Sequence, residues 1–393
     1  MSTTKEPLPV VLAGARGHGR QHLANIARLQ KEGLVRLAGV CELRPLSPDE
    51  LAGFDGPAAP LAPRQGQDLD ALLDSTGARI VVVCTPIQTH TDLALTAARH
   101  GAHLLLEKPP APSYEEFRRM ADGVARAGAV CQVGFQSLGS HALPAVRALI
   151  EDGAIGEVRG VGAAGAWVRG EAYFRRSPWA GRRRLDGVDV VDGALTNPLA
   201  HAVSTALALD GSTRAEEVAG VETELFRAND IESDDTSCVR VTTSRGGRVT
   251  VAATLCAEVA SEPYVVVHGS SGRITFWYKQ DRVLVQRSGH GPHETVHGRT
   301  DLLENLVRHL TRGDALLVPT DVCGAFMRVV EAVRTAPDPV RLPQSAWRHA
   351  DEGNAPRRVV QGVDALVAAG AESLRLYSEL GAPWALPTEV TTP

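Results

Sequence analysis

The sequence has few lysines, few aromatic residues and no long apolar run. Only four of its 41 basic residues are lysine, and aromatic residues make up 4% of the 393 positions. No apolar run approaches the about 20 residues of a membrane-spanning helix, and the opening residues carry no signal-peptide core. We therefore expect a cytoplasmic protein that does not associate with membranes.

The charge balance and the cysteines argue against further classes. A formal net charge of -5 gives no electrostatic reason to bind nucleic acid. The six cysteines lie far apart, with no C-x-x-C pair and no Cys/His cluster at zinc-ligand spacing. We expect small-molecule chemistry in a reducing compartment, without a bound metal.

Hydrophobic periodicity divides the chain into two parts, as its length also suggests. The first part alternates buried strands with amphipathic helices, which is typical of βαβ units around a parallel sheet. Later stretches rich in Val, Thr and Gly predict antiparallel hairpins. Strands are expected at 10–13, 34–41, 80–84, 104–106, 129–135, 237–243, 248–256, 264–268 and 273–278, and helices at 22–31, 92–100, from a Ser113–Glu116 capping box to about 127, and at 302–310, 322–333 and 363–380.

A glycine-rich turn follows the first strand. Gly14-Ala-Arg16-Gly17-His18-Gly19 stands where a dinucleotide fingerprint reads G-x-G-x-x-G. Glycines allow a sharp turn and bring backbone N–H groups to a pyrophosphate at a helix N-terminus. Arg16 replaces the middle glycine, and Gly17 compensates in part. The pattern predicts a dinucleotide site, with a merely tight strand-to-helix turn as the alternative.

Glu42 ends the second strand, within ~30 residues of the turn as the fingerprint requires. Its carboxylate can accept hydrogen bonds from ribose hydroxyls and repel a 2'-phosphate, so NAD is favoured over NADP. Arg16 and Arg44 leave NADP open, because guanidinium groups bind that phosphate. Both arginines can equally be solvated loop charges.

Further motifs carry a resemblance to a known family. The chain resembles the Gfo/Idh/MocA oxidoreductases at Gly14, Gly19 and His22, Thr85-Pro86, Glu107-Lys108-Pro109, Gly134-Phe135-Gln136, Ile155-Gly156-Glu157-Val158 and the helix containing His201.

The resemblance implies an α/β architecture, NAD or NADP as cofactor and a sugar, inositol or other polyol as substrate. A Rossmann domain (1–135) is followed by an α/β domain with a large, mostly antiparallel open-faced sheet (136–335), and we add a C-terminal helical extension (336–393). A homo-oligomer, dimer or tetramer, is expected by analogy. The expected cofactor residues are Gly14, Arg16, Gly17, His18, Gly19, Glu42, Arg44, Thr85, Pro86, His90, Glu107, Lys108 and Gln136.

In the family, the lysine of the E-K-P motif reaches the nicotinamide and the substrate hydroxyl, which here implies Lys108. A primary amine can hydrogen-bond the reacting oxygen and exchange a proton with it. An ordinary strand-end lysine is the alternative. Thr85 and Pro86 would line the cofactor channel or simply end a strand, and His90 would contact ligand or cap the next helix.

A second group of candidates lies near His201. Pro198 suits a first helical position, which predicts Asn197 as N-cap with His201 on the same face. Related dehydrogenases carry an aspartate four residues before this acid/base histidine, where this chain has Asn197. Either Lys108 takes a larger share of the proton transfer or Asp192 supplies the missing charge. A histidine packed on the sheet is the alternative.

An arginine-rich segment upstream adds the substrate candidates Arg176 and Trp179. Its arginines can hydrogen-bond hydroxyls or a carboxylate, and Tyr173 or Trp179 can pack on a sugar face; solvated or intersubunit roles are the alternative. Asp234 and Asp235 are adjacent in a strand and point to opposite faces, so we expect a structural pair and not a metal site.

The leading hypothesis is hydride transfer between NAD(P) and a sugar-like hydroxyl or keto group, with Lys108, His201 and Asn197 as the catalytic residues. A second enzymatic hypothesis is a glycoside-processing enzyme that uses tightly bound NAD for transient oxidation. Arg16 and Asn197 motivate a third, a non-catalytic dinucleotide sensor or scaffold.

Overall fold

The computed structural model describes residues 6–54, 62–352 and 355–385. The first five residues, on which the expectation of no signal peptide partly rests, lie outside this range. Within it, no helix combines the length and apolar character needed to cross a membrane. The chain divides into two compact units, residues 1–139 with 300–320, and residues 140–299 with 321–393.

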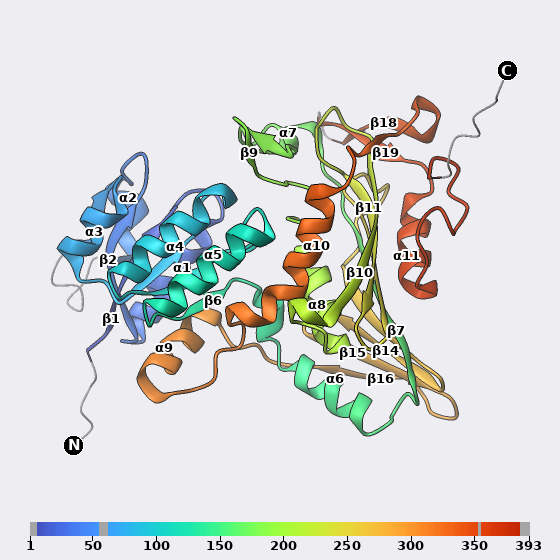
Figure 1. The fold of residues 1–393 in the computed structure, drawn as a ribbon, viewed down its shortest axis with the longest axis horizontal. Coiled ribbons are helices and arrows are strands. Elements are labelled where there is room, and N and C mark those ends of the chain that lie inside the picture. Colours follow the sequence, from blue (N-terminus) through green and yellow to red (C-terminus); the bar gives the residue numbers. More distant parts are fainter. Residues whose placement is uncertain (1–5, 55–61, 353–354, 386–393) are drawn as a thin grey trace. The chain divides into compact units, whose positions relative to one another are not determined.

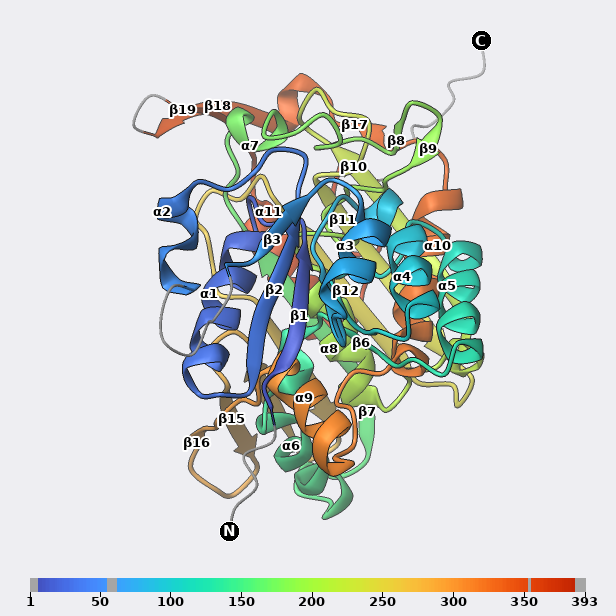
Figure 2. The same ribbon diagram turned by 90° about the vertical axis from the view of Figure 1, so that its left-hand side faces the viewer.

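The first unit is a six-stranded sheet in the order β3-β2-β1-β4-β5-β6, with every pairing parallel. Helices α1 and α9 cover one face, and α3, α4 and α5 cover the other (Figure 2). The fully buried strand β4 has the uninterrupted apolar run that such a sheet requires. Its elements are β1 (Leu8–Ala13), α1 (Gly19–Lys31), β2 (Val35–Cys41), α2 (Pro48–Leu51), β3 (Arg64–Gly66), α3 (Leu69–Thr76), β4 (Ile80–Val83), α4 (His90–Arg99), β5 (His103–Leu106), α5 (Tyr114–Arg126), β6 (Cys131–Val133) and α9 (Leu302–Arg312).

The second unit is built on a nine-stranded mixed sheet in the order β16-β15-β14-β13-β7-β12-β11-β10-β17. Most pairings are antiparallel, while β7 runs parallel to β12 and β17 to β10. Its elements are α6 (Ala142–Glu151), β7 (Val158–Ala166), α7 (Glu171–Phe174), β8 (Arg184–Leu185), β9 (Val188–Asp189), α8 (Ala200–Asp210), β10 (Val218–Arg227), β11 (Thr236–Thr243), β12 (Arg248–Thr254), β13 (Tyr264–Gly269), β14 (Gly272–Trp277), β15 (Arg282–Arg287), β16 (His293–Val296), α10 (Gly324–Thr335), β17 (Val340–Arg341), β18 (Trp347–Glu352), β19 (Ala355–Val360) and α11 (Val363–Ser373).

Helices cover both faces of this sheet: α8 and α10 lie on one side and α11 on the other (Figure 1). Glycines in β7 allow the helical layers on both sides to approach the sheet closely. A Cβ at Gly165 would meet the Leu199 side chain at 2.5 Å, and one at Gly162 would lie 1.9 Å from the Ala371 carbonyl oxygen. The strand therefore presents Gly162 and Ala164 to α11 and Gly165 to the opposite layer.

The observed division of the chain differs from the expected boundaries in two ways. Residues 300–320 belong to the first unit, because buried Gln132 donates to Leu302 O at 3.2 Å and to Asn305 Oδ1 at 2.5 Å. The segment from 336 belongs to the second unit, where it contributes strands as well as α11. That helix ends at Ser373, before the expected 380, because Leu374 adopts a left-handed conformation with φ of 56°.

Candidate functional site

The turn between β1 and α1 has the geometry of a phosphate-binding loop. Gly14 has φ of 84°, and a Cβ there would lie 2.3 Å from the Cys84 carbonyl oxygen. A Cβ at Gly19 would lie 2.0 Å from the Gly14 oxygen, and Gly17 has φ of 58°. All three glycines are therefore required by backbone geometry. They bring the end of β1 to the N-terminus of α1, where anions bind.

Glu42 and Arg16 both contact the loops at this edge of the sheet. Glu42 follows β2, and its carboxylate accepts a hydrogen bond from the Ala15 N–H at 3.0 Å. Arg16 turns away from the helix N-terminus: it pairs with Glu50 at 3.2 Å and donates to the carbonyls of Arg44 and Pro45. The arginine at the middle-glycine position therefore leaves the turn itself open, while Glu42 lies beside the turn.

The loop after β4 contains Thr85, Pro86 and His90. The Thr85 hydroxyl pairs with that of Thr89 at 2.6 Å, and Pro86 is exposed. His90 is buried, and its ring nitrogens lie 2.9 Å from the carbonyl oxygens of Thr85 and Pro109. Burial lowers its pKa. Both ring nitrogens of His90 thus have protein partners that connect this loop to the segment after β5, and α4 has Thr89 rather than His90 as its N-cap.

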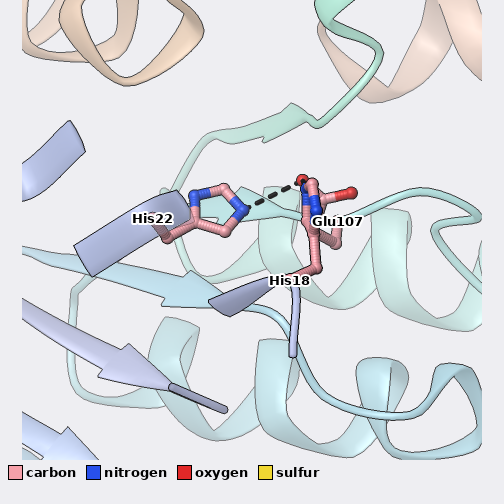
Figure 3. Close-up of side chains that lie close together, drawn as sticks. All are labelled: His18, His22 and Glu107. Carbon is pink, nitrogen blue, oxygen red and sulfur yellow. Dashed lines mark hydrogen bonds and ion pairs between the residues drawn. The ribbon is translucent and has the colours of Figure 1, made fainter. Parts of the chain in front are cut away.

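Glu107 connects the glycine turn to the segment after β5. Its Oε1 lies 3.0 Å from His22 Nε2 and 3.6 Å from His18 Nε2 (Figure 3), and it accepts a hydrogen bond from Gln136 at 3.0 Å. Burial alone would raise the pKa of Glu107, but the polar contacts with His18 and His22 outweigh burial and hold the pKa well below its usual range. The carboxylate is therefore ionised at neutral pH.

Two backbone features fix this carboxylate in place. The Lys108 N–H donates to Glu107 Oε2 at 3.1 Å. A Cβ at Gly134 would lie 2.9 Å from Glu107 Oε1, so the glycine of the Gly134-Phe135-Gln136 motif provides the space for the carboxylate. Lys108 is half-buried and follows β5 directly, at the same carboxyl edge of the sheet as the glycine turn.

In the second unit, Asp192 joins two of the predicted residues. It accepts a hydrogen bond from Asn197 Nδ2 at 2.6 Å and pairs with Arg176 at 3.1 Å. The Gly181 N–H also donates to it, at 2.7 Å. The expected N-cap role of Asn197 is wrong: α8 begins at Ala200 with Leu199 as N-cap, because the amide of Asn197 is directed to Asp192.

The aromatic residues of the arginine-rich segment stack on one guanidinium. Arg176 lies 3.8 Å from the Tyr173 ring centroid and 4.7 Å from that of Trp179, which are cation–π distances. Both rings thus contact Arg176. A cavity of about 540 Å³ lies nearby in this unit and is lined by Arg175 and Arg182, but neither Arg176 nor Trp179 lines it.

The backbone before His201 is strained and tightly held. Val191 has φ of 44°, which is rare for a β-branched residue and is typical of functional segments. A Cβ at Gly193 would lie 2.1 Å from Asp234 Oδ1, and Asp234 accepts from the Ala194 N–H at 2.9 Å. Asp234 therefore positions the segment that leads to His201.

Asp235 is also structural: it accepts hydrogen bonds from the N–H groups of Ala228 and Asn229. Burial raises the pKa of both Asp234 and Asp235. They lie just before β11 and contact different segments, in keeping with a structural pair. His201 is half-buried, with its ring centroid 6.4 Å from that of buried Tyr278.

Sequence reasoning missed three features of this arrangement. His22 was used only for the resemblance, although His18 and His22 stand four residues apart at the start of a helix, where they share a face. Asp234 was given no place near the site, because only the fold brings it to Gly193. The hydroxyl of Tyr278 is buried and has no hydrogen-bond partner among the described residues, and no local pattern marks it.

The predicted residues thus form two groups. Lys108 and the cofactor candidates belong to the first unit, and Asn197, His201, Arg176 and Trp179 belong to the second. The parallel sheet with its glycine turn defines a dinucleotide-binding domain of the Rossmann type.

Comparison with known families agrees with this class. Residues 8–135 match an oxidoreductase family model described as an NAD-binding Rossmann fold, and residues 144–275 match the C-terminal domain model of the same family. The chain belongs to the Gfo/Idh/MocA oxidoreductase family.

Several characterised relatives are similar over part of the chain. Levoglucosan dehydrogenase of Pseudarthrobacter phenanthrenivorans is 29% identical over 150 residues, which cover 38% of this chain and 37% of that protein. Inositol 2-dehydrogenase of Rhizobium meliloti is 31% identical over 145 residues, or 37% and 42% of the two chains. The chain thus spans about two fifths of the length of these relatives.

Solved structures share the fold over most of the chain. The WlbA dehydrogenase of Bordetella pertussis, solved with NADH and UDP-GlcNAcA, has a TM-score of 0.66 at 21% identity. The match covers 83% of this chain and 95% of the WlbA chain. An oxidoreductase domain protein of Kribbella flavida has a TM-score of 0.68 at 22% identity, covering 84% and 97%. At these identities the likeness concerns the fold.

Proposed function

We propose that this protein is an NAD(P)-dependent oxidoreductase, with NAD preferred, that acts on a hydroxyl or keto group of a sugar, polyol or glycoside. One observation carries the proposal. The ionised Glu107 links the glycine turn, through His22, to the backbone of Lys108. The primary amine therefore follows β5 at the edge of the sheet where the turn is suited to a pyrophosphate.

The residues fit a dinucleotide. Gly14, Gly17 and Gly19 leave the turn without side chains at its tightest points, and Arg16 is directed to the loop after β2. Glu42 lies beside Ala15, where a carboxylate accepts hydrogen bonds from ribose hydroxyls. The bound nicotinamide supplies the hydride acceptor or donor.

The protein supplies proton transfer and orientation. In the oxidative direction, the neutral Lys108 amine hydrogen-bonds the substrate hydroxyl and accepts its proton at Nζ. His201 is the second proposed acid/base, in a segment oriented by Asp234 and by the Asp192–Asn197 pair. The sugar or polyol class of substrate is supported by the activities of the levoglucosan and inositol dehydrogenases to which the chain is similar.

A cofactor-linked absorbance screen tests this function. Monosaccharides, inositols, glycosides and their keto forms are offered with NAD or NADH to wild type, Lys108→Ala and a control. The control is Lys279→Ala, which changes an exposed lysine in the turn between β14 and β15. Lys108→Ala should lose about 10²–10⁴-fold in turnover and retain dinucleotide affinity. Equal turnover of Lys108→Ala and wild type would remove Lys108 from the mechanism.

Two further outcomes would change the assignment. Glycoside cleavage with recycled, tightly bound NAD and no net NADH would indicate the transient-oxidation reaction. Dinucleotide binding without turnover on any substrate would indicate a sensor or scaffold.

We also propose a cytoplasmic homo-oligomer. None of the six cysteines forms a disulfide, which fits a reducing compartment, and homo-oligomers are the commonest assemblies of soluble proteins. Since α11 covers one face of the nine-stranded sheet, subunits would associate through another surface. Light scattering on the purified protein measures the assembly, and a mass of one chain would contradict it.

A further inference from the structure

His18, His22 and Glu107 bring three metal-ligating side chains together. His18 is the N-cap of α1, His22 lies one turn later, and Glu107 follows β5. One nitrogen of each ring and one carboxylate oxygen all lie within 4.8 Å of one another (Figure 3). Elsewhere in the described part of the chain, no comparable group of histidine, cysteine and carboxylate side chains is found.

The spacing of these atoms is close to that of a coordination sphere. Zinc binds histidine nitrogen at about 2.0–2.1 Å and carboxylate oxygen at about 2.0–2.2 Å. Adjacent ligands of a tetrahedral site are then about 3.4 Å apart. The observed separations from Glu107 Oε1, 3.0 Å to His22 Nε2 and 3.6 Å to His18 Nε2, lie on either side of this value. Small rotations of the side chains would therefore admit an ion.

The surroundings hold the carboxylate as an outer layer of a metal site does. Gln136 donates to Glu107 Oε1, and the Lys108 N–H donates to Oε2. The side chains of His22 and Glu107 are 7% exposed, while that of His18 is 49% exposed. Three protein ligands with one open side is the arrangement in which zinc keeps a position for water or another ligand.

We propose that His18, His22 and Glu107 bind one zinc-class divalent cation in the dinucleotide-free protein, and that this cation and the dinucleotide exclude each other. His18 belongs to the Gly14–Gly19 turn, so an ion held by its ring and carrying a water molecule occupies the space above the turn. This second part rests on the proposed function. The site is inhibitory, and it would make dinucleotide binding sensitive to free zinc.

Direct metal binding tests the first part without enzyme activity. The protein is stripped with a chelator, and zinc is titrated in competition with a chromophoric chelator. Cobalt absorbance in the visible range reports a tetrahedral nitrogen and oxygen site. Wild type should bind one ion per chain with micromolar or better affinity. His18→Ala, which alters the exposed ligand and should leave folding intact, should weaken binding about tenfold or more.

The matched control is His290→Ala, which removes an exposed histidine of the second unit and should not change zinc affinity. Equal zinc affinity of wild type and His18→Ala, or no binding to wild type at micromolar zinc, would overturn the site.

Dinucleotide titration with and without zinc tests the second part. Zinc should raise the apparent Kd for NAD in wild type, and the same rise in His18→Ala should need about tenfold more zinc or above. Zinc binding that does not change the NAD affinity of wild type would overturn the exclusion. A protein that binds zinc but never a dinucleotide would contradict the proposed function and leave the metal site standing, so the two failures are distinguishable.

Discussion

Asn197 donates a hydrogen bond of 2.6 Å to Asp192 Oδ1, five residues earlier in the chain. The amide thereby holds the carboxylate that also pairs with Arg176. An aspartate at position 197 would place two carboxylates in contact, and one of them would have to take up a proton.

Asn197→Asp should therefore destabilise the protein by about 1–3 kcal/mol at pH 8. The shared proton raises the pKa of the pair when folded, so the loss grows as the pH rises and is smaller at pH 5. Urea denaturation at both values measures it. The double variant Asp192→Asn with Asn197→Asp again places an amide donor beside a carboxylate acceptor, so it should recover part of the lost stability. If the free-energy losses of the two single variants simply add in the double variant, the coupling is refuted.

Glu42→Ala should relax the preference for NAD. The change removes the carboxylate beside Ala15, which we propose repels a 2'-phosphate, so the NADP affinity should rise relative to that of NAD by about tenfold. Binding of both dinucleotides is measured by calorimetry. Glu115→Ala, at an exposed position of α5, is the control. An unaltered ratio of NAD affinity to NADP affinity would show that Glu42 does not discriminate between the two adenosine riboses.

Gly162→Val should disrupt the packing of α11 on the sheet. The new Cβ would lie 1.9 Å from the Ala371 carbonyl oxygen, and a backbone atom has little freedom to yield. Overpacking of this kind costs about 1–3 kcal/mol or more. Gly220→Ala in β10, where no atom lies within 4 Å of the new Cβ, should be close to neutral. Similar denaturation midpoints for the two variants would contradict the tight fit.

Acid should loosen the segment after α11. Arg240 pairs with Glu222 and Glu379 at 2.8 Å. A hydrogen bond from Arg240 lowers the pKa of Glu222, and a hydrogen bond from the Leu376 N–H lowers the pKa of Glu379. Both pKa values thus lie below the ordinary value of 4.5. These depressed pKa values stabilise the fold above pH 4.5, and the contribution is lost as the pH falls further.

The carboxylates of Glu222 and Glu379 are more than a third exposed, so solvent screening limits each pair to below about 1 kcal/mol. The ring centroid of Trp384 lies 4.7 Å from that of Phe226 and 5.4 Å from that of Tyr377. The fluorescence of Trp384 therefore reports release of the segment after α11 from the sheet. Glu379→Gln should flatten the acid response, and Trp384→Phe should remove the signal. A response that Glu379→Gln leaves unchanged would assign the acid sensitivity to other groups.

Local patterns predicted five of the six strands of the first sheet and its glycine turn, but neither the short edge strand β3 nor helix α3. Strand β4 is apolar throughout because both of its faces are covered, and Ser113 accepts a hydrogen bond from the Glu116 N–H at the start of α5, as its spacing predicted. The glycines of the first turn were predicted for the same backbone reasons that the structure shows.

Long-range contacts were beyond the reach of these patterns. Asn197 was predicted as a cap because Asn-Pro favours a helix start, but Asp192 competes for its amide. Residues 300–320 join the first unit through Gln132, whose partners lie about 170 positions away in sequence. The pairing of His18 and His22 with Glu107 likewise needs the parallel sheet to bring the carboxyl end of β5, two strands away from β1, to the N-terminus of α1. Only the family resemblance pointed to Lys108 and His201 together.

The position of α11 along the chain has a consequence for biosynthesis. All nine strands of the large sheet are translated before this helix, which covers Ala164, Ala252 and their apolar neighbours. A nascent chain that has completed the sheet therefore exposes a broad apolar surface to water until residues 363–377 leave the ribosome. During that interval the exposed apolar surface makes the chain prone to aggregation.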